Sequence, residues 1–287
     1  MRDVELTERA RAIAGNRTGG ASELLSELLP LLEQALRHGR PAVLDVARLV
    51  CADQAAMAPL WNACASALAN VDRPERFAAR SAEMARAPRL LERAAALALG
   101  DVIQRVAPSR DPADDAPRGH ARVITLSYSH GVASVLARLA VEQHVVVICG
   151  QSLPGGEGER MCGTLKAGGA SAELVEDALL TTYLDSRTLV VVGADAISAR
   201  DFTNKAGTLG LVAAASFMGS GVYVVASRDK AQSTELWARV RLPRDFERTP
   251  VDLVTQFLTE AGPLPPTAVL KMAGRFQSEI TQLLAQL

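Results

Sequence analysis

Residues 188–195 read Thr-Leu-Val-Val-Val-Gly-Ala-Asp, an uninterrupted aliphatic run that ends in glycine and an acidic residue. A short run of this kind, rich in valine, predicts a β-strand that is buried on both faces. Similar apolar runs lie at 123–126, 145–149 and 222–226, and a weaker one lies at 172–175. The stretch at 188–195 is therefore one strand of a larger predicted sheet.

Helical patterns separate these strands, at 132–141, 157–167 and 208–218. Short apolar strands that alternate with helices predict the α/β class, with a parallel sheet covered by helices on both faces. In such sheets, ligands bind beyond the carboxyl ends of the strands. We therefore expect the chemistry in the segments that follow the strands, at 127–131, 150–158, 193–204 and 227–230.

The first 107 residues have a different pattern, which predicts helices throughout. Leucines recur at helical spacing between Leu24 and Leu36, and Ser22 and Glu23 stand where this helix would begin. Further helices are predicted at 41–51, 55–70, 74–87 and 88–106. Residues 108–119 contain three prolines and three aspartates, which favour turns. We predict an N-terminal helical domain at 1–107, a linker at 108–119 and a sheet domain at 120–287.

Composition excludes several classes of protein. The 287 residues include 31 Lys and Arg against 32 Asp and Glu, so the net charge of −1 argues against broad electrostatic binding of nucleic acid. No apolar stretch reaches about 18 residues, so no membrane span is expected, and the start shows no export signal, so we expect a cytoplasmic protein. The four cysteines form no CxxC pair, which predicts free thiols and neither a zinc site nor another metal or cofactor site.

Asp195 is the sharpest single candidate for chemistry, because it follows a buried strand at the mouth of the sheet. Gly193 and Ala194 would let the backbone approach a ligand closely. The carboxylate of Asp195 could bind sugar hydroxyls or act as a general base. It could equally cap a turn or the next helix.

Asn204-Lys205-Ala-Gly-Thr208 leads into the helix predicted at 208–218. Free N–H groups and the positive end of the helix dipole suit a phosphate there, with Asn204 and Lys205 as additional donors. The alternative is an ordinary helix cap beside an exposed lysine. Lys230 lies just past the exit of the next strand and is a further candidate cation for an anionic ligand.

Two glycine-rich segments could also bind an anion. Residues 150–158, which include Gln151 and Ser152, lack both the Walker sequence and the GxGxxG fingerprint, so they predict either a backbone cradle or a flexible turn. Arg17, with Gly19 and Gly20, precedes the first long helix as either a phosphate clamp or a capped turn. The polar residues at 127–130 lack the G-x-S-x-G pattern, so no hydrolase triad is expected.

These segments together resemble one family, the translation initiation factor two-B alpha/beta/delta group and its sugar-phosphate isomerase relatives. The isomerases are methylthioribose-1-phosphate isomerase and ribose-1,5-bisphosphate isomerase. The resemblance is specific over about 120–268 and weak over 1–107. It rests on segments that occur in family order: Arg17-Thr-Gly-Gly20, Ile124-Thr-Leu-Ser-Tyr-Ser129, Gln151-Ser-Leu-Pro-Gly-Gly-Glu-Gly158, Gly193-Ala-Asp-Ala-Ile197, Asn204-Lys-Ala-Gly-Thr208, Val222-Tyr-Val-Val-Ala226 and Thr249-Pro, followed by Leu258-Thr-Glu and Pro266.

The resemblance implies a helical domain, a Rossmann-like domain and a pocket between them for a sugar phosphate or a nucleoside monophosphate. It also implies a homodimer or a larger oligomer. Carried over to this sequence, it makes Asp195 the acid/base residue, Asn204 and Lys205 ligand contacts, and Arg17 with Gly19 the phosphate side. Completing the candidate site, we predict Ser127 as the second catalytic position and assign further ligand contacts to Gly20, Ser129, Gln151, Ser152 and Lys230.

Two departures from the isomerase pattern matter. The isomerase cysteine falls on Ser127, whose hydroxyl is far less acidic than a thiol. The arginine that helps to bind phosphate falls on Leu153, and losing such a donor costs on the order of 1.5–3 kcal/mol of binding. Cys149, at the mouth of the next strand, is a possible substitute thiol. Tyr128 and Ser129 instead match the non-catalytic initiation-factor subunits.

Three functions follow as expectations. The first is a binding protein for a phosphorylated sugar or nucleotide, without the cysteine-dependent chemistry. The second is an aldose–ketose isomerase that uses Asp195 as acid and base. The third is an assembly subunit of a larger protein complex.

Overall fold

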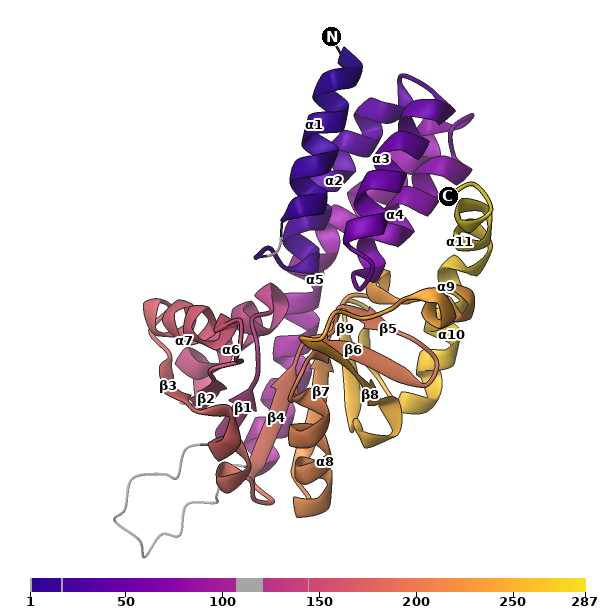
Figure 1. The fold of residues 1–287 in the computed structure, drawn as a ribbon. Coiled ribbons are helices and arrows are strands. Elements are labelled where there is room, and N and C mark those ends of the chain that lie inside the picture. Colours follow the sequence, from indigo (N-terminus) through magenta and orange to yellow (C-terminus); the bar gives the residue numbers. More distant parts are fainter. Residues whose placement is uncertain (1, 17, 107–120, 144) are drawn as a thin grey trace, which may run out of the picture.

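The computed structural model describes residues 2–16, 18–106, 121–143 and 145–287. Figure 1 shows a layer of N-terminal helices stacked on one end of a twisted sheet, with the C-terminal segment returning to the helical layer. The linker predicted at 108–119 lies outside the described residues. The predicted α/β class, with helices first and a mostly parallel sheet second, is confirmed.

The helical layer forms because its helices bury apolar stripes against one another. In α2, leucines at helical spacing are buried, among them Leu24, Leu28 and Leu32. Helix α4 is apolar on all sides and is buried along 58–68, so it forms the centre of the layer. The helices of this part of the chain are α1 (Arg2–Gly15), α2 (Ala21–Leu36), α3 (Arg40–Asp53), α4 (Ala58–Ala69) and α5 (Pro74–Val106).

Helix α5 corrects one prediction. Two helices were expected, at 74–87 and 88–106, but one helix runs through Pro88. A proline inside a helix removes one hydrogen bond to the preceding turn, and burial on both sides of Pro88 outweighs that loss here. The first half of α5 buries Phe77 in the helical layer, and the second half buries Leu99 against the sheet.

The main sheet has seven strands in the order β10-β9-β7-β4-β1-β2-β3. All neighbouring strands are parallel except β9 and β10. The five predicted strands are confirmed as β1, β2, β3, β4 and β7, and β9 and β10 were not predicted. The bounds are β1 (Arg122–Thr125), β2 (Val146–Gly150), β3 (Ser171–Val175), β4 (Thr188–Val192), β7 (Gly221–Val225), β9 (Gln256–Thr259) and β10 (Gly262–Leu264).

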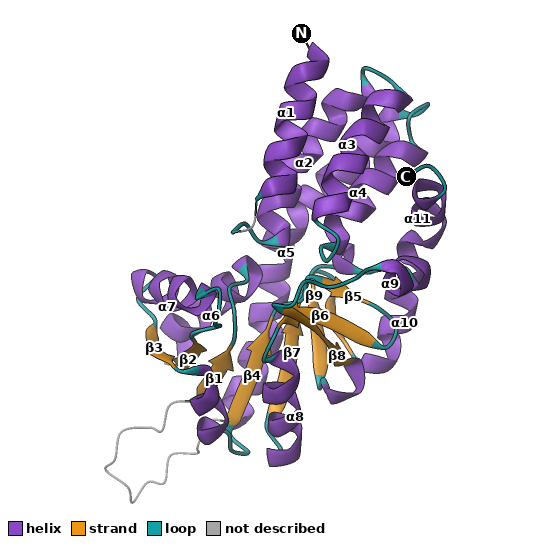
Figure 2. Ribbon diagram, viewed as in Figure 1, coloured by secondary structure: helices purple, strands orange, loops and turns teal. Residues whose placement is uncertain are grey.

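Helices cover both faces of this sheet, as predicted, because successive side chains of a strand point to opposite faces. Val191 of β4 packs with α5, α6 (His130–Gln143) and α7 (Glu157–Ala167) on one face. Val190 and Val192 pack with α8 (Thr208–Met218) on the other face, where the core continues into the helical layer. Figure 2 shows the strands enclosed by these helices.

A second, three-stranded antiparallel sheet was not predicted. It has the order β5-β6-β8, and its central strand β6 carries Asn204 and Lys205. The C-terminal helix α11 packs against α4, which ties the end of the chain to the helical layer. The remaining elements are β5 (Ala196–Ile197), β6 (Asp201–Lys205), β8 (Phe246–Pro250), α9 (Thr234–Arg239), α10 (Val269–Ala273), α11 (Gln277–Leu284), and the 3₁₀ helices η1 (Asp177–Tyr183), η2 (Arg228–Lys230), η3 (Val251–Leu253), η4 (Pro266–Ala268) and η5 (Gly274–Phe276).

The four thiols are free, as predicted, and all four are buried: Cys51, Cys64, Cys149 and Cys162. Cys149 faces the core between β2 and α7, where burial and the neighbouring Cys162 raise the pKa of its thiol to about 12. Within the described ranges, no helix is both long enough and apolar enough to cross a membrane.

The turn between β2 and α7 depends on Gly158, where a Cβ atom would lie 1.6 Å from the carbonyl oxygen of Gly150. We expect Gly158→Ala to lower the free energy of unfolding by at least about 3 kcal/mol, because two backbone segments would have to separate. The matched control is Gly163→Ala in the same helix, where a Cβ meets nothing within 4 Å.

The control should raise stability by about 0.5–1 kcal/mol, because alanine favours the helix. Urea unfolding of both variants measures the difference. Equal stabilities for the two variants would contradict this packing.

Candidate functional site

A cavity of about 770 Å³ lies where the helical layer meets the carboxyl edge of the sheet. Its walls come from the start of α2 (18–23), the exit of β1 (127–130), the turn before α7 (154–157) and the exit of β4 (194–195). Strands β1 and β4 are neighbours in the main sheet. After β1 the chain adds β2 on one side of this pair, and after β4 it adds β7 on the other side. A crevice opens at such a change of direction, and it is the usual ligand site of an open parallel sheet.

Hydrogen bonds from α4 fix the helical layer onto this edge of the sheet. The N–H of Ala58 donates to the carbonyl oxygen of Asp195 at 3.1 Å. The side-chain amide of Asn62 donates to the carbonyl oxygens of Asp229 and Ala231, each at 2.7 Å. Asn62 is fully buried, so these bonds are shielded from competing water. The walls of the cavity are therefore held together by one backbone N–H and one side-chain amide of α4, which donate to backbone carbonyl groups of the sheet domain.

Most of the predicted site residues line this one cavity. All four segments that follow the predicted strands contribute to its wall. Arg17 lies outside the described residues, and Gln151 and Ser152 do not line the cavity. The predicted residues that do line it are Gly19, Gly20, Ser127, Ser129, Asp195, Asn204, Lys205 and Lys230.

Ser152 supports the site from behind. It is buried, and its Oγ accepts the backbone N–H of Ser127 at 2.6 Å. Both serines have positive φ values, 69° for Ser127 and 63° for Ser152, a region that non-glycine residues rarely adopt. Asp177 accepts the N–H groups of Ser152 and Leu153 at 2.8 and 2.9 Å. These bonds hold Ser127 in a strained conformation at the cavity wall.

The loop around Leu153 adds no arginine to the site. Leu153 is 60% exposed and does not line the cavity. Cys149 does not replace the missing thiol, because it lies in the core and away from the cavity. Gly193 has a packing role instead of the expected approach to a ligand, since a Cβ atom there would lie 2.8 Å from Oγ of Ser129.

Asp195 lines the cavity, and its backbone N–H donates to the carbonyl oxygen of Thr203 at 2.8 Å. Burial raises the pKa of this carboxyl group, against the opposing charges of Lys230 and Lys205. A carboxyl group with a raised pKa can exchange a proton closer to neutral pH than an exposed one. The site therefore contains one group suited to proton transfer.

The two lysines of the cavity have different environments. Lys205 is 3% exposed, and its Nζ lies 2.6 Å from Oε1 of Glu157 and 3.3 Å from Oδ2 of Asp245. Burial alone would lower the pKa of Lys205, but these two carboxylates outweigh it and raise the pKa. Lys230 is also buried, and its ammonium group donates to the carbonyl oxygen of Ala194. Lys230 is thus the less neutralised of the two cations.

The helix that follows Asn204 and Lys205 begins at Thr208, as predicted, but its N-terminus already holds an anion. Oε1 of Glu247 accepts the N–H of Leu209 at 2.7 Å. Asn204 is engaged with Thr208 Oγ1 at 3.0 Å. The helices whose N-termini lie at the cavity are α2, α6 and α7. For each of them, residues in the first turn or directly before it line the wall.

The ion pair between Arg160 and Glu23 on the wall was not predicted from the sequence. Arg160 of α7 donates to Oε1 of Glu23 in α2 at 2.6 Å, and its guanidinium lies 3.8 Å from the ring centroid of Tyr128. Glu23 also accepts the N–H of Gly20 at 3.0 Å as part of a capping box. The capping position of Glu23 was visible in the sequence, but nothing in the spacing indicated that Arg160 would reach across to it.

Charge is balanced among the described residues of the wall. The basic residues are Lys205, Lys230, Arg160 and Arg244, and the acidic residues are Glu23, Glu157, Asp195 and Asp245. A wall of this kind offers ion pairs and hydrogen-bond donors but no excess of positive charge. It suits a small polar ligand with one anionic group better than a polyanion.

Comparison with known proteins finds a match between this chain and one protein family. A model of the initiation factor 2 subunit family matches residues 54–242, which include the exits of β1, β2, β4 and β7. A search of curated protein sequences found no match.

Solved structures with the same fold include the translation initiation factor eIF-2B of Pyrococcus horikoshii OT3, at 23% identity and a TM-score of 0.72, covering 91% of this chain and 97% of that one. The tetrameric eIF2B-beta2-delta2 complex of C. thermophilum matches at 15% identity and a TM-score of 0.72, covering 95% and 94%. Subunit delta of eIF-2B from A. fulgidus matches at 20% identity and a TM-score of 0.57, covering 93% and 91%. At these identities the likeness establishes the fold alone.

The raised pKa of Asp195 predicts how its replacement changes stability with pH. Folding raises the pKa of this carboxyl group, so the protonated form favours the folded state. The contribution to stability is complete at pH values below the pKa in the unfolded chain, and it is lost as the pH rises through the pKa in the folded protein. Asparagine does not titrate. We therefore expect Asp195→Asn to gain stability relative to the wild type between about pH 4 and about pH 7.

Thermal unfolding at the two pH values measures this gain. Asp252→Asn, which removes an exposed carboxyl group on η3 away from the cavity, is the matched control for the loss of one carboxyl group. A gain for Asp195→Asn that shrinks as the pH rises would contradict the assignment.

Proposed function

The chain belongs to the initiation factor 2 subunit family, and we propose that its cavity binds a small phosphorylated sugar or a nucleoside monophosphate. The observation that carries the proposal is the convergence of three helix N-termini and two buried lysines on one cavity at the carboxyl edge of the sheet. Helix N-termini present N–H groups and a partial positive charge, which favour a phosphate.

The phosphate is assigned to the side of the cavity formed by the starts of α2, α6 and α7. Arg160 stands there with a guanidinium group that has five N–H donors, and Glu23 engages only part of that group. Arg160 can therefore supply the charge that Leu153 does not. Lys230 adds a second cation, since its contact with Ala194 is to a neutral carbonyl.

The hydroxyl groups of the sugar are assigned to the exits of β1 and β4. Asp195 provides a carboxylate acceptor, and Ser127 and Ser129 provide hydroxyl groups. Lys205, already paired with Glu157 and Asp245, serves mainly to hold the wall of the cavity together. The balanced charge of the wall favours a ligand with one phosphate group.

Binding without the usual cysteine chemistry is favoured over isomerisation. The serine at position 127 and the buried Cys149 leave no thiol on the wall among the described residues. The raised pKa of Asp195 is the specific observation in favour of an aldose–ketose isomerase. Proton transfer between C1 and C2 of an open sugar would then depend on Asp195 alone as acid and base.

Assembly is a further role that the relatives suggest. The similar eIF2B-beta2-delta2 complex is a tetramer, and we propose that this chain also forms an oligomer, with a homodimer as the smallest form. This role is compatible with ligand binding, because the cavity lies within one chain. A cytoplasmic location remains a prediction from the sequence.

Ligand binding should raise the melting temperature. Ribose 5-phosphate or adenosine 5′-monophosphate, at roughly a hundred times its dissociation constant, should stabilise the protein by about 2.7 kcal/mol, or roughly 5 °C. Ribose, adenosine and inorganic phosphate serve as controls that lack either the phosphate or the sugar. The shift should fall in Lys230→Met and persist in Lys166→Met, which removes an exposed lysine of α7.

The same ligands allow a test of catalysis. Conversion of a ribose phosphate from aldose to ketose, followed by NMR and abolished in Asp195→Asn, would replace the binding proposal with the isomerase. The absence of any shift with phosphorylated sugars or nucleotides would contradict both.

A further inference from the structure

Arg160 and Glu23 form an ion pair on the cavity wall, and the two residues come from different layers. Arg160 belongs to α7 of the sheet domain and Glu23 to α2 of the helical layer, and both line the cavity. A terminal guanidinium nitrogen of Arg160 lies 2.6 Å from Oε1 of Glu23, and both side chains are partly exposed. The carboxylate of Glu23 therefore contacts the same guanidinium group to which we assign the phosphate of the ligand.

The carboxyl group of Glu23 has a second contact that fixes its position. Oε2 accepts the N–H of Gly20 at 3.0 Å, as part of the capping box at the start of α2. Burial alone would raise the pKa of Glu23, but the hydrogen bonds from Arg160 and Gly20 outweigh it and lower the pKa. Glu23 is thus an anion of the chain itself, held beside Arg160 by the start of a helix.

Tyr128 holds the guanidinium group of Arg160 independently of Glu23. The guanidinium carbon lies 3.8 Å from the centroid of the Tyr128 ring, which is a cation–π distance. Tyr128 follows β1 and also lines the cavity. Arg160 would therefore remain at the wall after losing its contact with Glu23, and its N–H donors could then bind another anion.

We propose that Glu23 competes with the phosphate group of the ligand for Arg160 and thereby limits the affinity of the cavity. This competition rests on the function proposed above and adds a residue of α2 that sets the affinity of that same site. A partly exposed ion pair changes an equilibrium by only about twofold to fivefold, so a phosphate group with further contacts can displace Glu23 from Arg160. The contact between Glu23 and Gly20 persists, so α2 keeps its capping box.

Calorimetric titration of Glu23→Gln with ribose 5-phosphate and with adenosine 5′-monophosphate tests the proposal. Glutamine can still accept the N–H of Gly20, but it carries no charge. We expect the full-length variant to bind the phosphorylated ligand about threefold more tightly than the wild type, because the competing carboxylate is gone. An equal or weaker affinity of the variant, with the wild type still binding, would overturn the competition alone. No binding of either ligand to either protein would overturn the ligand site itself.

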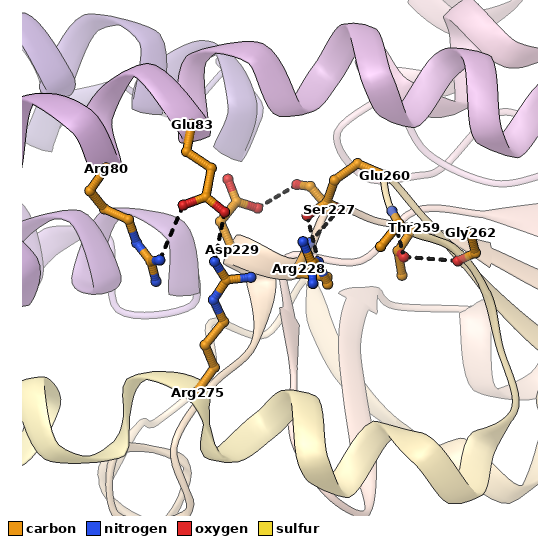
Figure 3. A network of polar contacts seen from close by, with 10 residues as sticks. Arg80, Glu83, Ser227, Arg228, Asp229, Thr259, Glu260, Gly262 and Arg275 are labelled. Carbon is orange, nitrogen blue, oxygen red and sulfur yellow. Dashed lines mark hydrogen bonds and ion pairs between the residues drawn. The ribbon is translucent and has the colours of Figure 1, made fainter.

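The matched control is another arginine–glutamate pair, which lies outside the cavity. Glu83 of α5 is paired with Arg275 of η5 at 2.8 Å, in the network that Figure 3 shows. Burial would raise the pKa of Glu83, and Arg275 outweighs it and lowers the pKa, as Arg160 does for Glu23. Glu83→Gln removes the same charge and a similar contact, so its dissociation constant should equal that of the wild type. An equal gain of affinity in both variants would overturn the specific role of Glu23.

A double-mutant cycle tests whether Glu23 acts through Arg160. Arg160→Gln should weaken binding of the phosphorylated ligand, because a charged donor is lost. Adding Glu23→Gln to this variant should bring no further gain, since no guanidinium group remains for the two anions to share. A threefold gain from Glu23→Gln in both backgrounds would overturn the competition for Arg160.

Discussion

The rest of the structure depends on the hydrogen bonds from α4 to the loops at the carboxyl edge of the sheet. Asn62 bridges the carbonyl groups of Asp229 and Ala231, and Ala58 donates to Asp195. Because α4 is buried on all sides, it cannot shift without disturbing the whole helical layer. Together with the apolar core that continues through both layers, these bonds fix the position of the helical layer at the edge of the cavity.

The same junction explains why the cavity contains so many ion pairs. Lys205 is almost fully buried at the wall of the cavity, and its partner Glu157 is half-buried. A buried charge must be paired, so Lys205 lies close to two carboxylates and Lys230 donates to a carbonyl group. Arg160 and Glu23 extend this pairing across the two layers. A phosphate that enters competes with internal carboxylates, which favours ligands that also use the hydroxyl contacts.

The sequence predicted the parts of the fold that depend on local pattern. The valine runs indicated the central strands. The rule that ligands bind at the carboxyl ends of parallel strands indicated which loops would meet, including those that carry Asp195 and Lys230. It did not indicate that α5 continues through Pro88, because that depends on packing against two different cores. Nor did the sequence indicate β6 and β8, whose side chains do not alternate clearly between apolar and polar. Arg160 was missed because its contact with Glu23 joins residues 137 positions apart.

We propose that the α4 hydrogen bonds hold the cavity in the shape that binds the ligand, and the dissociation constant of Asn62→Leu tests this proposal most directly. Asn62 does not line the cavity, so its replacement changes the junction and no ligand contact. Calorimetric titration with ribose 5-phosphate should give a dissociation constant at least about tenfold weaker than that of the wild type, while the circular dichroism spectrum stays the same. Equal dissociation constants for the two proteins would contradict the claim.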